Sequence, residues 1–192
     1  MEKLILLGGG GHCRSCIDVI ESGKRFAIEG IIDLAEKVGT KVLSYPIMGT
    51  DAELAELARR YRNFFITLGQ LRNPEPRVFL YKKLKELSVS IPCLISPHAY
   101  VSTHARIGEG TIIMHGAIVN AGANIGNNCI INSTALIEHD ALIGDHCHIA
   151  TGAIINGGVV VGPETFIGSG CITKQYIVIP EKSFIPAHSL MK

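Results

Sequence analysis

The C-terminal half of the chain repeats every six residues. Residues 95–172 divide into thirteen consecutive hexapeptides without an insertion, and each begins with Ile or Val. The fifth residue is always small (Ala, Thr, Cys or Val). β-Branched residues suit short strands, and a small residue four places later also fits an inward-facing position. Three such faces close a triangular coil of 18 residues, so the repeat predicts a parallel β-helix of a little over four coils around one aliphatic core.

The same repeat predicts which residues stack, because positions 18 apart should lie on neighbouring coils. Cys129 and Cys147 are related in this way, and we expect both to be small core residues. The pattern weakens after residue 172, where the segment from Thr173 to Lys192 is expected to leave the frame and form a cap or a last partial coil.

Residues 1–92 follow a different pattern. Predicted strands at 3–7, 26–32 and 63–68 alternate with predicted helices at 13–22, 50–61 and 75–87. Thr50 and Glu53 have the spacing of a capping box at a helix start. Strands alternating with helices indicate a small, parallel, Rossmann-like α/β sheet. We therefore expect two domains, at residues 1–92 and 93–192.

Composition excludes several classes of protein. Hydrophobic residues make up 47% of the chain and charged residues 18%, which argues against disorder. A net charge of +1 offers no electrostatic basis for binding nucleic acid or a membrane surface. No apolar run is long enough for a membrane span or a signal peptide. Six cysteines without a framework spacing suit a reducing compartment, so we expect a cytoplasmic protein.

A glycine-rich turn follows the first predicted strand. Gly8 to Gly11 precede His12 and a helix, where free N–H groups could hold a nucleotide phosphate. Asp33 ends the second strand, in a position to meet a ribose or base. Because Cys13 stands where a dinucleotide fingerprint has its third glycine, a mononucleotide on an activated sugar fits better than NAD. Cys13 and Cys16 are more typical of helix packing than of a redox or zinc pair.

The triplet Glu138-His139-Asp140 is the strongest candidate for chemistry. His139 is the third residue of its hexapeptide, so it should stand outward at a corner of the coil. A neighbouring carboxylate could hold the imidazole tautomer and raise its basicity, as a general base for an amine or alcohol requires. Gly157 lies 18 residues later and should stack on His139. We expect its backbone N–H to meet a thioester oxygen as negative charge develops there.

These residues carry a family resemblance over the whole chain. The stretches LLGGGGH, IID, ITLG and INSTALIEHDALIGDHCHIATGA resemble the sugar acetyltransferases typified by PglD and NeuD. The resemblance implies a left-handed β-helix and a homotrimer that binds acetyl-CoA between adjacent subunits. It also implies an N-terminal domain that binds a nucleotide sugar. His139 matches the family's general base and Asp140 its modulating carboxylate. The other implied positions are His148 near the thioester, Ser169 and Ala187 at coenzyme A, and Gly10, Gly11, His12, Asp33 and Gly69 at the nucleotide sugar.

The function that this resemblance implies is acetyl-CoA-dependent N-acetylation of a nucleotide-linked 4-amino-6-deoxy sugar in bacterial glycan biosynthesis, by direct transfer and without a metal. O-acetylation of a sialic-acid-type sugar is the alternative, and the sequence does not distinguish the nucleotide. A trimeric zinc hydratase of the carbonic-anhydrase type would need metal ligands such as His139, His146 and His148, but the usual H-x4-H spacing is absent. A rigid assembly scaffold is the non-enzymatic alternative.

Overall fold

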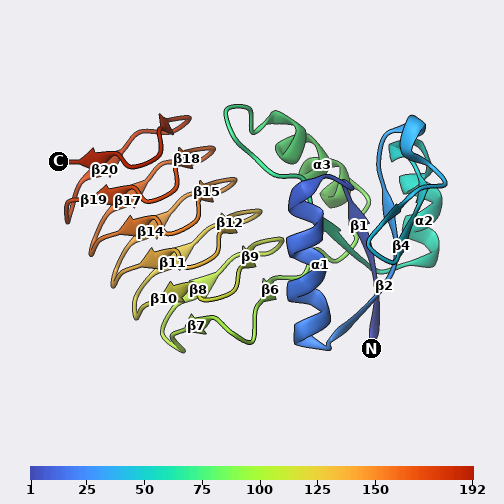
Figure 1. Ribbon diagram of the computed structural model, residues 1–192, viewed down its shortest axis with the longest axis horizontal. Helices are drawn as coiled ribbons and strands as arrows, with labels where there is room; N and C mark the ends of the chain where they lie inside the picture. The colour runs from blue at the N-terminus through green and yellow to red at the C-terminus, as the bar shows by residue number, and fades with distance from the viewer. The chain divides into compact units, whose positions relative to one another are not determined.

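The computed structural model describes residues 1–192 and divides into two compact units. The first unit comprises Met1–Gly69 and Glu75–Pro92, and the second comprises Gln70–Pro74 and Cys93–Lys192. The short segment between Gly69 and Glu75 thus belongs to the same unit as the repeats, although it precedes them by some twenty residues of chain. Figure 1 labels the elements of both units.

The first unit is built on a five-stranded sheet. Its strands lie in the order β3-β4-β2-β1-β5, with β4, β2, β1 and β5 parallel and β3 antiparallel to β4. The strand bounds are β1 (Glu2–Leu7), β2 (Phe26–Ile32), β3 (Lys41–Val42), β4 (Tyr45–Gly49) and β5 (Asn63–Ile66). The predicted parallel sheet is therefore present, with an antiparallel edge that the sequence did not indicate. The turn between β3 and β4 has Leu43 at φ +54°, a position that Gly or Asn usually occupies in a hairpin.

Three α-helices accompany this sheet: α1 (Gly11–Gly23), α2 (Leu54–Arg60) and α3 (Glu75–Glu86). Short 3-10 turns η1 (Ala35–Lys37) and η2 (Asp51–Glu53) connect them to the strands. The predicted capping box is present, since Thr50 Oγ1 accepts from the Ala52 N–H and Glu53 Oε2 from the Thr50 N–H. Cys13 and Cys16 lie buried on α1 as free thiols, and burial raises the pKa of both.

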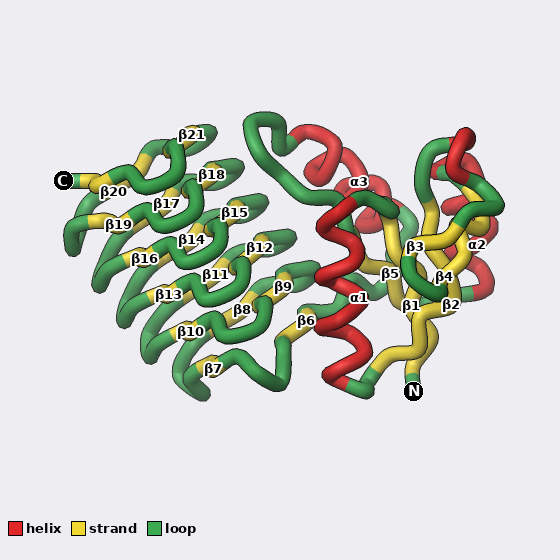
Figure 2. Tube along the Cα trace, viewed as in Figure 1, coloured by secondary structure: helices red, strands yellow, loops and turns green.

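The second unit is the predicted β-helix, and it is left-handed. Its strands are two residues long and recur every six residues, so they appear as short segments separated by turns (Figure 2). They form three parallel sheets, which we name by their first strands. Their bounds are, for the β7 sheet, β7 (Tyr100–Val101), β10 (Ile118–Val119), β13 (Leu136–Ile137), β16 (Ile154–Ile155), β19 (Ile172–Thr173) and β22 (Leu190–Met191); for the β8 sheet, β8 (Arg106–Ile107), β11 (Asn124–Ile125), β14 (Leu142–Ile143), β17 (Val160–Val161) and β20 (Val178–Ile179); and for the β6 sheet, β6 (Leu94–Ile95), β9 (Ile112–Ile113), β12 (Ile130–Ile131), β15 (His148–Ile149), β18 (Phe166–Ile167) and β21 (Phe184–Ile185).

The strand register matches the predicted stacking of residues 18 apart. Ile118 pairs with Leu136, and Leu136 pairs with Ile154. The first and fifth residues of the hexapeptides fill one continuous core, which includes Cys129 and Cys147 at 0% exposure. The hydrogen bond with Cys129 and burial raise the pKa of the Cys147 thiol, so Cys147 serves the core as a neutral side chain.

The expected departure of the tail from the frame is wrong. Strands β20, β21 and β22 continue the six-residue spacing, with Thr173, Ile179, Ile185 and Met191 at the first place of each hexapeptide. Thr173 obscured the pattern because it is polar, yet it is 1% exposed and its hydroxyl accepts from the Asn156 N–H at 2.9 Å. The coil therefore has more than five turns rather than four.

From the third hexapeptide onward, the fourth place of every hexapeptide is in the left-handed conformation, whereas His98 and His104 at the first two are not. That place holds Gly110, Gly116, Gly122, Gly152, Gly158 and Gly170, and elsewhere Asn128, Thr134, Asp140, His146, Glu164, Tyr176, Lys182 and His188, all at φ between 52° and 78°. Glycine tolerates this conformation freely, whereas other residues adopt it at a cost.

None of the helices has the length and hydrophobicity of a membrane span.

Candidate active site

His139 stands in the turn between β13 and β14, at the corner where the β7 and β8 sheets meet; we call this the His139 corner. Its Nδ1 lies 2.9 Å from Oδ2 of Asp140, and the two side chains are 49% and 71% exposed. An ionised carboxylate only accepts hydrogen bonds, so Asp140 selects the tautomer with the proton on Nδ1. Nε2 then keeps its lone pair and faces away from Asp140.

Glu138, the other carboxylate of the triplet, has a structural task. Its Oε2 accepts from Asn120 Nδ2 at 2.9 Å and from the His139 N–H at 3.3 Å. These bonds tie one coil to the preceding one and shape the turn. Of the two carboxylates that flank His139, Asp140 is therefore the one that orients the imidazole.

Gly157 lies against the imidazole from the next coil. A Cβ atom built on Gly157 would come within 2.5 Å of His139 Nε2 and 2.6 Å of Cε1. The adjacent Gly158 N–H donates to the His139 carbonyl at 3.0 Å, which holds the two turns together. The structure thus brings His139, Asp140 and Gly157 into one place, and only a residue without a side chain leaves room for the ring.

His148 lies elsewhere on the coil. It belongs to β15 in the β6 sheet, opposite the His139 corner, and is 7% exposed. Its Nδ1 lies 2.6 Å from the Gln70 carbonyl and its Nε2 lies 3.1 Å from Asn132 Nδ2. Within one chain the structure does not bring His148 to His139. Gln70, in the segment 70–74, also donates from Nε2 to the His146 carbonyl, a role that no sequence signal indicated.

Ser169 and Ala187 meet each other but not His139. Both are exposed third residues of their hexapeptides, at the corner between the β6 and β7 sheets. The His188 N–H donates to the Ser169 carbonyl at 2.8 Å, so the two turns stack on adjacent coils. The two corners that carry the predicted chemistry and the predicted coenzyme contacts therefore border the same β7 sheet from opposite sides.

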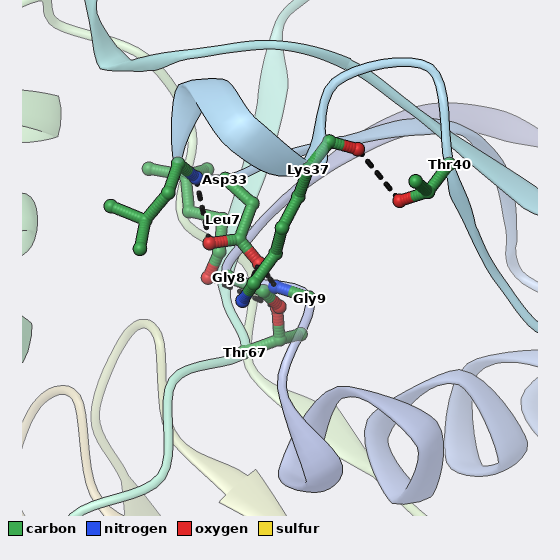
Figure 3. A network of polar contacts seen from close by, with 8 residues as sticks. Leu7, Gly8, Gly9, Asp33, Lys37, Thr40 and Thr67 are labelled. Carbon is green, nitrogen blue, oxygen red and sulfur yellow. Dashed lines mark hydrogen bonds and ion pairs between the residues drawn. The ribbon is translucent and has the colours of Figure 1, made fainter.

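The first unit holds its glycine-rich turn, Gly8–Gly11, with one carboxylate (Figure 3). Asp33 Oδ2 accepts from the Gly9 N–H at 2.7 Å and from Lys37 Nζ at 2.9 Å, while Oδ1 accepts from the Leu34 N–H at 2.8 Å. Burial of the carboxylate would raise its pKa, but the donors, Lys37 foremost, hold the pKa of Asp33 below its usual value. We expected Asp33 to meet a ribose or base; in the structure its carboxylate is largely occupied by its own chain.

The remaining predicted residues of this unit surround the start of α1. A Cβ atom on Gly10 or Gly11 would meet nothing within 4 Å, and no side chain caps the helix that follows. Gly69 lies beside His12: a Cβ atom built on Gly69 would be 3.5 Å from the Cβ of His12. Thr67, which sequence reasoning missed, donates to the Gly8 carbonyl at 2.6 Å and steadies the turn. Thr67 lies within the ITLG stretch, but the family resemblance assigns it no role.

A pocket of about 300 Å³ opens beside this turn. It lies at the carboxyl ends of the parallel strands, where ligands of open α/β sheets bind. Its lining residues are Gly8, Ile32, Asp33, Leu34, Ala35, Thr50, Asp51, Ala52, Leu68 and Leu80.

The metal alternative depends on a cluster of ligands. The three histidines lie apart on the coil. His139 is at the corner between the β7 and β8 sheets, His146 is at the corner between the β8 and β6 sheets, and His148 is on the β6 sheet. No group of three His, Cys, Asp or Glu side chains in the chain is arranged to hold a metal ion. The single chain therefore does not assemble the ligand set that a zinc hydratase would need.

Comparisons with known proteins cover both units. Residues 3–84 match the model of the PglD N-terminal domain, and residues 89–189 match that of the GMPPB C-terminal domain. No curated protein matches the sequence significantly. A histidine-to-asparagine mutant of perosamine N-acetyltransferase from Caulobacter crescentus, solved with CoA and GDP-perosamine, is similar with a TM-score of 0.93 and 28% identity, over 100% of this chain and 89% of that one.

The acetyltransferase domain of PglB from Neisseria gonorrhoeae is similar with a TM-score of 0.91 and 26% identity, over 100% of this chain and 92% of that one. The same domain solved with acetyl coenzyme A gives a TM-score of 0.89, again at 26% identity, over 99% and 92%. The likeness spans both the glycine-rich sheet unit and the β-helix with its His139 corner. Residues 3–84 therefore belong to the PglD N-terminal domain family, and the chain as a whole is similar to the PglD-like sugar acetyltransferases.

Proposed function

We propose that this protein transfers the acetyl group of acetyl-CoA to the amine of a nucleotide-linked amino sugar of the 4-amino-6-deoxy type. The observation that carries the proposal is the His139 corner, where Nε2 faces the bare backbone of Gly157 while Asp140 holds Nδ1. The similar Caulobacter enzyme is a perosamine N-acetyltransferase solved with GDP-perosamine, and the similar Neisseria domain was solved with acetyl coenzyme A.

The chemistry follows from this geometry. His139 Nε2 takes a proton from the amine, whose nitrogen attacks the carbonyl carbon of the thioester. The C–N bond forms and the carbonyl oxygen becomes an oxyanion, which the Gly157 N–H stabilises; this donor has no hydrogen-bond partner in the chain. The C–S bond then breaks, and the coenzyme A thiolate leaves and recovers the proton from the imidazolium. Asp140 stabilises the imidazolium while it exists.

The nucleotide end of the acceptor fits the first unit. The diphosphate would meet the N–H groups at the start of α1, where Gly10 and Gly11 leave the backbone open. The nucleoside would occupy the 300 Å³ pocket beside Asp33. The role of Asp33 in this proposal is to hold the turn through the Gly9 N–H, not to bind the base directly.

We further propose that the active protein is a homotrimer. The outward positions of the β7 sheet carry exposed apolar side chains, among them Tyr100 at 60%, Ile118 at 40% and Ile172 at 41%. The neighbouring β8 sheet exposes Leu142 and Val178. Contiguous apolar surface of this kind is typical of an interface. A ring of three copies could join the His139 corner of one to the coenzyme corner of the next, which one chain keeps apart.

Light scattering tests the trimer. Wild type should have three times the mass of the chain, and Ile118→Glu should lower the mass and abolish turnover because it buries a charge in the interface. The matched surface change Lys182→Glu should leave both unchanged. A fully active wild-type monomer would exclude the trimer.

Turnover of acetyl-CoA against a panel of nucleotide amino sugars tests the activity. At least one amine should be acetylated, and His139→Asn should lower kcat by about 10²- to 10⁴-fold while nucleotide-sugar binding persists. Acetylation of hydroxyl sugars of the sialic-acid type alone would replace the proposal with O-acetylation. Failure to bind acetyl-CoA would favour the scaffold alternative, and stoichiometric zinc with hydratase activity the metal alternative.

A further inference from the structure

Tyr176 is an unusual residue for its place in the coil. It sits in the turn after β19 at the fourth place of its hexapeptide, with φ +60° and 71% exposure. A bulky residue rarely adopts this left-handed conformation. The other residues at that place in the coil are glycines or side chains of polar type, and no other phenyl ring occurs among them. A large exposed aromatic ring in a costly conformation calls for a reason beyond the stability of the turn.

The ring lies against the glycine step that faces His139. A Cβ atom on Gly158 would come within 2.3 Å of Cδ1 and 2.4 Å of Cε1 of Tyr176. On the preceding residue, a Cβ atom on Gly157 would meet the His139 imidazole. The two side chains therefore approach the Gly157–Gly158 step from opposite coils, His139 from the coil before and Tyr176 from the coil after.

Backbone hydrogen bonds hold the three turns in this arrangement. The Gly158 N–H donates to the His139 carbonyl, and the Tyr176 N–H donates to the Gly157 carbonyl, both at 3.0 Å. The Cα atoms of Gly157 and Gly158 are only about 3.8 Å apart. The Tyr176 ring therefore lies next to the space in front of His139 Nε2. Gly157–Gly158 is also the single Gly-Gly pair of the β-helix. Its backbone is therefore covered only by the rings of His139 and Tyr176.

This position limits the room for the acyl group, given the proposed function. During transfer the carbonyl carbon must lie within reach of the amine at His139 Nε2 and of the Gly157 N–H. The remaining substituents of that carbon are the sulfur and the acyl chain. We propose that the ring of Tyr176 closes the acyl end of the site and restricts the donor to a two-carbon acyl thioester. A longer chain would have to displace the ring from Gly158.

Acyl-chain selectivity tests this proposal. Tyr176→Asn removes the ring and supplies a residue that suits positive φ, so the turn should remain folded. Tyr176→Phe keeps the ring and removes the hydroxyl. Lys182→Asn is the matched control, because Lys182 occupies the same fourth place at another corner, at φ +56°. Each variant and the wild type are assayed with acetyl-, propionyl- and butyryl-CoA at a saturating acceptor concentration, and circular dichroism confirms the fold.

One methylene group in a fitted pocket changes kcat/KM by about 10- to 200-fold. We expect Tyr176→Asn to raise the ratio of propionyl-CoA to acetyl-CoA kcat/KM by about tenfold or more, and Tyr176→Phe and Lys182→Asn to leave it within about twofold. An unchanged ratio in an active Tyr176→Asn variant overturns the role of Tyr176 alone. A wild type that turns over no acyl-CoA overturns the proposed function, and this proposal with it.

Discussion

Two glycine-rich steps do different work in this protein. At Gly10 and Gly11 an added side chain would meet nothing within 4 Å, so the chain itself has no steric need for glycine there. At Gly157 and Gly158 an added side chain would strike His139 and Tyr176. The first step is open to solvent, whereas the second is bare because the protein's own rings occupy the space. Under the proposed function, a ligand would require the first pair of glycines and the geometry around His139 the second.

The aspartates beside the two steps differ in their exposure and in what they bond to. Asp33 has 8% of its side chain exposed and accepts three hydrogen bonds, from Gly9, Leu34 and Lys37. Asp140 is 71% exposed and holds one imidazole nitrogen. The buried carboxylate fixes a backbone turn, and the exposed one orients the imidazole that we propose as the general base.

Among changes at the two glycine steps and their aspartates, Gly157→Ala should have the largest effect. Its methyl group would lie 2.5 Å from His139 Nε2, so the imidazole must move out of the reacting position. We expect kcat to fall by about 10²- to 10⁴-fold, the range for losing a general base, with the melting temperature nearly unchanged because the imidazole is exposed and can turn away. Steady-state kinetics and thermal unfolding measure the two quantities. Near-normal kcat would show that the two residues do not act together.

Asp140→Asn should have the next largest effect. An amide can hold either tautomer and no longer stabilises the imidazolium, so kcat should fall by roughly tenfold or more with an unchanged KM for acetyl-CoA. The loss should be smaller than in buried triads, because water screens an exposed pair. Glu138→Gln is the comparison variant, and it should cost less kcat than Asp140→Asn. The reverse order would assign the orienting role to Glu138.

Gly10→Ala tests the step that is open to a ligand. We expect the KM of the nucleotide sugar to rise about tenfold, since a methyl group would stand where the phosphate approaches the backbone, while kcat at saturation and the melting temperature stay near wild type. Gly8→Ala is the contrasting variant. Gly8 has φ +104°, and its added Cβ would lie 2.4 Å from Leu68, so that change should lower the melting temperature. If both variants only destabilised the fold, the first step would have no ligand role.

The smallest expected effect concerns Asp33 and pH. Its pKa is lowered by folding, so its hydrogen bonds stabilise the fold above the unfolded-state pKa of about 4, and this contribution is lost as the pH falls through the lower folded-state pKa. Asp33→Asn should lower the free energy of unfolding by about 1 kcal/mol at pH 7, with the difference vanishing in strong acid. Urea unfolding measures it, with the exposed Glu86→Gln as control. An equal loss at every pH would point to packing rather than charge.

Much of the fold could be predicted from sequence periodicity. The Ile and Val positions and the small fifth residues define inward faces, and a register of 18 residues follows because one coil has three such faces. Prediction failed where a residue broke the pattern without breaking the structure. Thr173 is polar but buries its hydroxyl in a hydrogen bond, and Leu43 makes a hairpin turn without the usual Gly or Asn.

The candidate site was predictable only in part. His139, Asp140 and Gly157 could be placed together because their meeting depends on the register alone. Tyr176 shares that register with Gly158 but went unnoticed, since exposed tyrosines are common and only its contact with a bare backbone distinguishes it. Lys37 and Thr67 act through bonds to Asp33 and Gly8 that depend on the path of the loops, which periodicity does not describe.

By itself, then, the sequence determined the β-helix, its core and the coil neighbours of His139, because a strict repeat makes every contact along the coil a local consequence of the period. Only the tertiary structure decided which carboxylate holds the imidazole and which donors the Asp33 carboxylate accepts from. It also decided that His148 and Ser169 lie on a different sheet and a different corner from His139. These outcomes depend on side-chain directions and on loops without a repeat, where contacts form between residues that no period relates.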